Sequence, residues 1–121
     1  MSRTAVKLRS RALAELLARE AAALKGDAIR ILDVSELLYI TDFFVIVTTQ
    51  SARQTRALAE ALRAAAKAST GAKGSEEGGS KSPWVLCDFD TVVVHVLTPE
   101  AREFYDLDGL WADAEEVEFA A

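Results

Sequence analysis

The residues of this sequence that could do chemistry lie close together, between a glycine-rich segment and a run of valines. Gly78-Gly79-Ser80 is followed by Asp88-Phe89-Asp90. Nucleotidyltransferases hold a triphosphate and two metal ions with such a Gly-Gly-Ser turn and an Asp-x-Asp pair on a strand. Two carboxylates two residues apart on a strand point to the same side, where they could share Mg²⁺. One hypothesis is therefore a nucleotidyltransferase-like enzyme that uses Asp88 and Asp90 with Mg²⁺.

The spacing of these residues fits that enzyme badly. Seven residues separate Ser80 from Asp88, fewer than this arrangement usually has, and no third carboxylate falls on the following strand. Asp90 lies between two expected strands, and aspartate is an ordinary turn residue. The sequence therefore favours a turn over a metal site, and we expect no metal and no cofactor.

A nucleophilic site is the second chemical possibility, because Cys87 and Asp88 precede the single histidine, His95, by a few residues. Adjacent residues of a strand face opposite sides, so Cys87 and Asp88 cannot both converge on His95. A structural, hydrogen-bonded histidine is the favoured interpretation. The sequence also has no P-loop, dinucleotide fingerprint or histidine pair. We therefore expect no catalytic residue.

The aromatic residues near the C-terminus are interleaved with acids. Residues 84–121 hold ten Asp or Glu and one Arg, a net charge of −9, whereas residues 1–30 carry +4. Nucleic-acid affinity comes largely from cationic side chains, so this end disfavours direct DNA binding. Trp and Tyr are enriched at interface hot spots, which indicates recognition of a basic protein. Some of the rings could instead fill the core. The rings in question are Trp84, Phe89, Phe104, Tyr105 and Trp111, and of these we expect Trp84 to be exposed, because it follows Pro83 where a loop enters a strand.

A single domain over residues 1–121 must position these side chains. The chain is 50% hydrophobic and 27% charged, which is the composition of a packed globular protein. One cysteine cannot form an internal disulfide, and no apolar run approaches the roughly 18 residues of a membrane-spanning helix. We therefore expect a cytoplasmic protein with no membrane partner.

Apolar periodicity predicts two long helices, over residues 12–25 and from Ser51 onward. We expect Gly26 to end the first helix at a positive φ, and Ser51 and Gln54 to form a capping box in which each side chain meets the other's amide. These helix faces could pack internally or form a homodimer. The predicted buried stripe of the second helix is Ala57, Leu58, Ala61, Leu62 and Ala65.

Four strands are expected, and they give a mixed sheet. Residues 28–34 nearly alternate, residues 43–49 are apolar on both faces as in a central strand, and residues 84–89 and 91–97 suggest a hairpin around Asp90. Thr98 and Pro99 predict a short third helix. Residues 69–83 are expected to form a flexible surface loop and residues 113–121 an acidic tail. The predicted class is α/β, with a sheet of four to five strands and flanking helices.

An ordered set of motifs makes the whole chain similar to one family. The chain resembles the ribosomal silencing factor, or Iojap, family from the first helix to about Ala114. The motifs are Ile40-Thr-Asp42, Ser51-Ala-Arg-Gln54, Trp84-Val-Leu-Cys-Asp88, Val93-Val-His-Val96 and Arg102-Glu-Phe-Tyr-Asp-Leu107 with Leu110-Trp111. The resemblance implies a protein without catalytic activity, whose fold is similar to nucleotidyltransferases. It implies binding to the large ribosomal subunit through ribosomal protein fourteen, on the face that meets the small subunit, so that the subunits cannot associate and translation is repressed under nutrient limitation.

The resemblance also implies which residues contact the partner. Trp84 and Tyr105 match aromatic residues that the family uses against its ribosomal partner. By the same matching, the neighbouring contact residues are Leu86, Asp88, Asp106 and Leu110. One departure lies after Asp88-Phe89, where the family usually has Gly-Asp and this chain has Asp90-Thr91. The type of that turn is therefore open.

Overall fold

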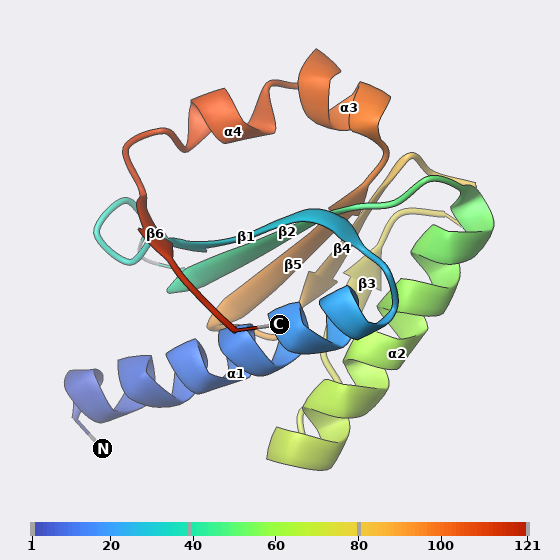
Figure 1. Cartoon of the computed structure of the whole chain (residues 1–121). Helices are drawn as coiled ribbons and strands as arrows, with labels where there is room; N and C mark the ends of the chain where they lie inside the picture. Colours follow the sequence, from blue (N-terminus) through green and yellow to red (C-terminus); the bar gives the residue numbers. More distant parts are fainter. Residues whose placement is uncertain (1, 39, 80, 121) are drawn as a thin grey trace.

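The computed structural model describes residues 2–38, 40–79 and 81–120. It shows a mixed sheet with helices on both faces (Figure 1), which confirms the predicted α/β class. The sheet has six strands instead of four to five. In chain order the elements are α1 (Arg3–Ala23), β1 (Asp27–Asp33), β2 (Phe43–Thr48), α2 (Ala52–Thr70), β3 (Ser75–Glu77), β4 (Trp84–Asp88), β5 (Val92–Leu97), α3 (Pro99–Phe104), α4 (Leu107–Leu110) and β6 (Glu115–Val117).

The strand order β3-β4-β5-β2-β1-β6 places β2 inside the sheet. Every residue of β2 is buried, as predicted for a strand that is covered on both faces. β2 pairs with β5 in parallel, from Phe43 opposite Val92 to Thr48 opposite Leu97. The other pairs are antiparallel, including the predicted β4–β5 hairpin. The parallel pair gives the sheet two distinct ends, and each end carries one cavity described below.

The two unpredicted strands lie at the edges of the sheet. β3 falls inside the segment expected to be only a loop, and it pairs with β4. β6 falls inside the expected acidic tail, where Val117 is buried opposite Ile31 of β1. Each of these strands has three residues and is mostly polar. Hydrophobic periodicity cannot mark so short a segment, so the pairing depends on the neighbouring strand.

The first helix is longer than predicted and ends differently. It begins at Arg3, after the Ser2 hydroxyl accepts a hydrogen bond from the Ala5 amide. The positive φ, 66°, belongs to Lys25 and not to Gly26, so that prediction was wrong. Gly26 is needed for close packing instead, because a Cβ there would lie 2.5 Å from Cγ1 of Val47.

The second helix begins at the predicted cap. The Ser51 hydroxyl accepts a hydrogen bond from the Gln54 amide at 3.0 Å. The other half of the capping box was wrong, because the Gln54 side chain accepts from the amide of Gln50 at 2.7 Å. Of the predicted stripe only Leu58 and Leu62 are fully buried. Ala57 is exposed and Ala61 and Ala65 are partly buried, and the remaining buried positions are Thr55, Ala59 and Ala66.

The two faces of the sheet carry separate apolar clusters. α1 and α2 cover one face, and their apolar sides pack against the sheet there, together with residues such as Val45 and Val94. α3 and α4 cover the opposite face, as Figure 1 shows. The cluster on that face is smaller and includes Phe44, Leu97 and Leu107. Trp84, one of the predicted contact residues, packs against this second cluster.

Candidate protein-binding site

Trp84 opens β4 on the face that α3 and α4 cover. Its indole N–H donates a hydrogen bond to Nδ1 of His95 at 3.2 Å, and its ring packs on the second apolar cluster. The side chain is therefore half-buried, whereas Phe104 and Tyr105 are exposed, so the prediction that singled out Trp84 as the exposed ring was wrong. The hydrogen bond fixes the indole at the border of the cluster.

His95 is a structural residue, as predicted. Only 6% of it is exposed, and its ring centroid lies 4.5 Å from that of Phe44 in an edge-on arrangement. Burial lowers the pKa of His95 to about 4, so the imidazole is neutral at physiological pH. A neutral imidazole can accept the Trp84 proton at Nδ1. Among the described residues, its Nε2 has no hydrogen-bond partner.

Cys87 lies on the opposite face of the sheet from His95. The β4–β5 register places Leu86, and not Cys87, opposite the histidine. Cys87 is fully buried in the cluster beneath α1 and α2, and burial raises the pKa of its thiol to about 12. A buried neutral thiol is a poor nucleophile. The structure therefore gives these two residues no shared chemistry.

Tyr105 is positioned by the short helix α3. The helix begins as predicted, with Pro99 in its first turn and the Thr98 hydroxyl accepting from the Ala101 amide at 3.1 Å. Tyr105 caps the other end, and its ring lies 5.1 Å from the Trp84 ring between centroids. Half of Tyr105 is exposed. The end of α3 thus places Tyr105 directly beside Trp84, the other aromatic residue that is predicted to contact the partner.

Phe104 is a member of this site that the sequence reasoning did not select. Its ring meets the Tyr105 ring edge-on at 5.0 Å, and 80% of the residue is exposed. Trp84, Tyr105 and Phe104 thus form a continuous row of rings, which we call the aromatic row. The sequence placed Phe104 among the aromatic residues that are interleaved with acids, next to Tyr105, but did not separate it from the rings that fill the core.

An open hollow of about 380 Å³ lies beside the aromatic row. Its lining brings together Trp84, Leu86 and Tyr105, three of the predicted contact residues. Gly78 lines it as well, with a φ of 111°, and a Cβ there would lie 2.8 Å from the Trp84 carbonyl oxygen. This glycine therefore serves close packing at the hollow. Ser80, the third residue of the supposed triphosphate turn, lies outside the described residues.

The other three predicted contact residues lie outside the hollow. Asp106 caps α4 by accepting a hydrogen bond from the Gly109 amide, and Leu110 ends that helix with 67% of its surface exposed. Asp88 is at the far end of β4, roughly 13 Å along the strand from Trp84. Its carboxylate accepts the amide of Asp90, whose φ of 74° marks the predicted turn. The aspartate pair is thus engaged in turn formation.

A network of ion pairs fastens α3 and α4 to the sheet. The Arg102 guanidinium contacts both Asp108 oxygens, at 2.8 and 2.9 Å, and donates to the Ala28 carbonyl at 2.7 Å. Arg30 contacts Asp108 at 2.6 Å and Glu116 at 2.8 Å. The Arg102 hydrogen bonds hold the pKa of Asp108 well below its usual range, although partial burial opposes this. Two cations therefore neutralise only part of the acidic region.

Comparison with known proteins places this chain. The sequence profile described as "Ribosomal silencing factor during starvation" matches residues 7–121. The chain belongs to the ribosomal silencing factor family. A Haemophilus influenzae ribosomal silencing factor is 37% identical over 101 residues, which span 84% of this chain and 99% of the relative. A Zymomonas mobilis ribosomal silencing factor is 38% identical over 77 residues, which span 64% of this chain but only 58% of the relative's length.

A solved structure shares the architecture of this silencing factor family member. A Bacillus halodurans protein superimposes with a TM-score of 0.76 and 30% identity, over 89% of this chain and 98% of that one. The family links the chain to regulation of translation at the ribosome. Within residues 2–38, 40–79 and 81–120, no helix is long and apolar enough to cross a membrane.

Proposed function

We propose that the chain is a translational repressor of the cytoplasm that binds the large ribosomal subunit through its ribosomal protein fourteen. It covers the face that meets the small subunit, so the two subunits cannot associate, and no step of this mechanism needs catalysis. The observation that carries the proposal is the aromatic row, which lies half in solvent beside an open hollow. Family membership supports it, because the relatives are named ribosomal silencing factors.

The aromatic row has the chemistry of an interface anchor. Trp84 is fixed by its hydrogen bond to His95, and the Tyr105 ring packs against it at a tilt of 48°, so both rings are ordered before a partner arrives. Preorganised aromatic side chains lose little conformational entropy on binding. The hollow offers a partner side chain a place beside the rings. This region is therefore suited to bury a partner's apolar surface.

The charge around the aromatic row suits a basic partner. Glu100 and Glu103 of α3 are exposed, and neither has an ion pair within the described part of the chain. Glu77 lies on the rim of the hollow. Complementary charge speeds the encounter with a basic protein, whereas the rings supply the buried area. Ribosomal proteins are generally basic, so the acidic side chains would attract such a partner and the rings would supply the buried contact area.

Sedimentation with purified ribosomal subunits tests the proposal. The chain is expected to migrate with large subunits alone and to reduce the amount of joined ribosomes when small subunits are added. Tyr105→Ala, at a half-exposed anchor, should weaken large-subunit binding by about 1–4 kcal/mol while the fold is kept. Trp84→Ala should do the same, with circular dichroism reporting whether loss of the His95 bond disturbs the sheet.

Leu8→Ala is the matched control, because Leu8 is 64% exposed and lies on α1, away from the aromatic row. It should bind and silence as the unaltered chain does. Failure of the unaltered chain to co-sediment with large subunits would overturn the proposed function. Normal binding by folded Tyr105→Ala and Trp84→Ala would overturn the placement of the site.

A further inference from the structure

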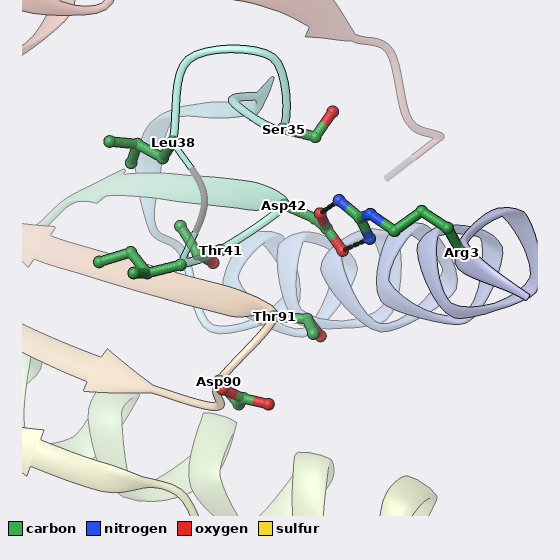
Figure 2. A pocket seen from close by; sticks show the side chains of 8 residues that line it. Arg3, Ser35, Leu38, Thr41, Asp42, Asp90 and Thr91 are labelled. Carbon is green, nitrogen blue, oxygen red and sulfur yellow. Dashed lines mark hydrogen bonds and ion pairs between the residues drawn. The ribbon is translucent and has the colours of Figure 1, made fainter. Parts of the chain in front are cut away.

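A second cavity lies at the opposite end of the sheet, where β2 and β5 begin. It measures about 430 Å³, and its lining includes Arg3, Thr41, Asp42, Asp90 and Thr91 (Figure 2). The aromatic row is at the other end of these two strands, roughly 20 Å away along β2. The second cavity is therefore separate from the proposed ribosomal contact.

Asp42 is the fixed group of this cavity. Only 4% of its side chain is exposed, and its backbone amide donates to the Thr91 carbonyl at 2.9 Å. Its own carbonyl accepts the Val34 amide at 2.8 Å. A buried carboxylate needs a cationic or hydrogen-bonding partner, because desolvation strongly disfavours an isolated charge. Asp42 is thus a rigid anion that requires a cation.

Arg3 supplies that cation from a loosely held position. Its guanidinium meets both Asp42 oxygens, with Nη1 at 3.0 Å from Oδ2 and Nη2 on Oδ1. This paired geometry is the one that a guanidinium and a carboxylate prefer. However, Arg3 is the first residue of α1, and 63% of its side chain is exposed. Helix ends fray at low free energy, so the cation can leave while Asp42 stays in place.

Two further groups of the cavity lack partners in the described structure. The Thr41 hydroxyl is buried without a hydrogen bond, and in Figure 2 it points toward the space between Asp42 and Thr91. Asp90, on the opposite side, is exposed and has no ion pair among the described residues. Arg3 therefore pairs with the Asp42 carboxylate and leaves the Thr41 hydroxyl and the Asp90 carboxylate of the cavity without a partner in the described structure.

The rim of the cavity adds an apolar surface. Ile40 lines it and is 80% exposed, and Leu38 lines it as well. Arginine and lysine side chains bury their aliphatic stems on apolar surfaces and direct their charge to a polar site. A carboxylate at the base, a second carboxylate and a hydroxyl nearby, and an apolar rim match such a side chain.

We propose that this cavity is a receptor for a guanidinium or ammonium group from a second molecule, which takes the place of Arg3 on Asp42. The group belongs either to a basic side chain of a partner protein or to a small free cation. In both cases the incoming cation pairs with Asp42, donates toward Thr41 and is attracted by Asp90. The inference does not depend on the proposed ribosomal contact.

Titration of the full chain with arginine probes tests the receptor. The probes are N-acetylargininamide and the peptide Gly-Ser-Arg-Ser-Gly, each compared with its neutral citrulline analogue, and amide chemical shifts of residues 40–43 and 91 report binding. In Arg3→Ala the arginine probes should bind about tenfold more tightly than in the unaltered chain, because the internal competitor is gone. The citrulline probes should not bind. Binding of the peptide tenfold tighter than N-acetylargininamide identifies a protein side chain as the ligand, and equal binding identifies a free cation.

Matched variants separate the receptor from a general loss of charge. Lys7→Ala removes another cation of α1, which pairs with Asp33 at 2.9 Å and does not line the cavity, so it should behave as the unaltered chain does. Adding Asp42→Asn to Arg3→Ala should abolish binding. If that double variant fails to fold, Asp90→Asn in the Arg3→Ala chain should still weaken binding several-fold. Equal binding of arginine and citrulline probes, or no binding to folded Arg3→Ala, would overturn the proposal.

Discussion

The two faces of the sheet are covered in opposite ways. α1 and α2, with 21 and 19 residues, bury one large apolar cluster. α3 and α4, with six and four residues, cover a smaller cluster and leave Phe104 and Leu110 in solvent. Burial of apolar area dominates folding stability, so the first face carries most of it. Exposed apolar residues grouped together indicate binding, so the second face is available to a partner.

α3 and α4 depend on polar contacts to stay folded and in place on the second face. Helices of four to six residues are not stable in isolation. Thr98 and Asp106 cap them, and Arg102 joins them to the sheet. A small number of specific bonds therefore positions Tyr105, in contrast to the distributed packing under α1 and α2.

The largest expected effect on stability belongs to the first face. Leu17 of α1 is fully buried against the sheet, and Leu17→Ala removes side-chain atoms that the packed cluster cannot replace. We expect the free energy of unfolding to fall by about 2–5 kcal/mol, measured by urea denaturation. Leu8→Ala, an exposed leucine of the same helix, should change it by no more than about 0.5 kcal/mol. Equal losses in both variants would contradict the assignment of stability to this face.

A pH titration of stability measures the burial of His95 on the second face. Its folded pKa of about 4 lies below the ordinary value of 6.5, so the unfolded chain binds a proton between these values and the folded chain does not. The contribution of His95 to the free energy of unfolding is fully present above pH 6.5. It is lost as the pH drops toward 4, and the total loss is roughly 3 kcal/mol. His95→Gln keeps an acceptor for Trp84 but does not titrate. Its unfolding free energy should lack this slope, and an unchanged slope would show that other groups cause it.

Local signals in the sequence were sufficient for several elements. The Ser51 and Thr98 caps act within three residues, and the apolar run of β2 is continuous, so each could be read from neighbouring residues. β3 and β6 could not be predicted, because a three-residue segment with at most one apolar side chain becomes a strand only when another strand lies beside it.

The candidate site was only partly predictable for the same reason. Family resemblance selected Trp84 and Tyr105, but the half-burial of Trp84 depends on His95, which is 11 residues away. The exposure of Phe104 depends on how α3 packs. The Asp42 cavity joins residues 39 positions apart, Arg3 and Asp42, and no local pattern marks such a pair.

An intermediate effect is expected where the second face is attached. Arg102→Gln removes the paired contact to Asp108, and we expect a loss of about 1–2 kcal/mol because Asp108 is partly exposed and solvent screens the pair. The lowered pKa of Asp108 means that this contribution is present above the ordinary pKa of about 4 and disappears as the pH falls below it. The difference between the two chains in urea should therefore shrink on acidification.

Arg11→Gln is the control for that variant, because Arg11 forms an exposed pair with Glu15 on α1. Such a pair contributes about 0.5 kcal/mol or less, so this change should be nearly silent. If the difference between the unaltered chain and Arg102→Gln stayed constant from neutral to acidic pH, the loss would come from packing of the arginine stem and its hydrogen bonds to the Ala28 carbonyl and the Thr48 hydroxyl, and not from the ion pair.

The smallest effect on stability is expected at Phe104. This variant distinguishes most clearly between a face that stabilises the fold and a face that binds a partner. The ring is 80% exposed and its described ring contact is with Tyr105, so Phe104→Ser should change the free energy of unfolding by about 0.5 kcal/mol or less. If the aromatic row is the ribosomal contact, the same variant should weaken large-subunit binding by at least about 1 kcal/mol. Leu17→Ala should show the reverse, since its folded fraction keeps an intact aromatic row. A stability loss in Phe104→Ser as large as that in Leu17→Ala would mean that both faces serve the core and that Phe104 is packed in solution.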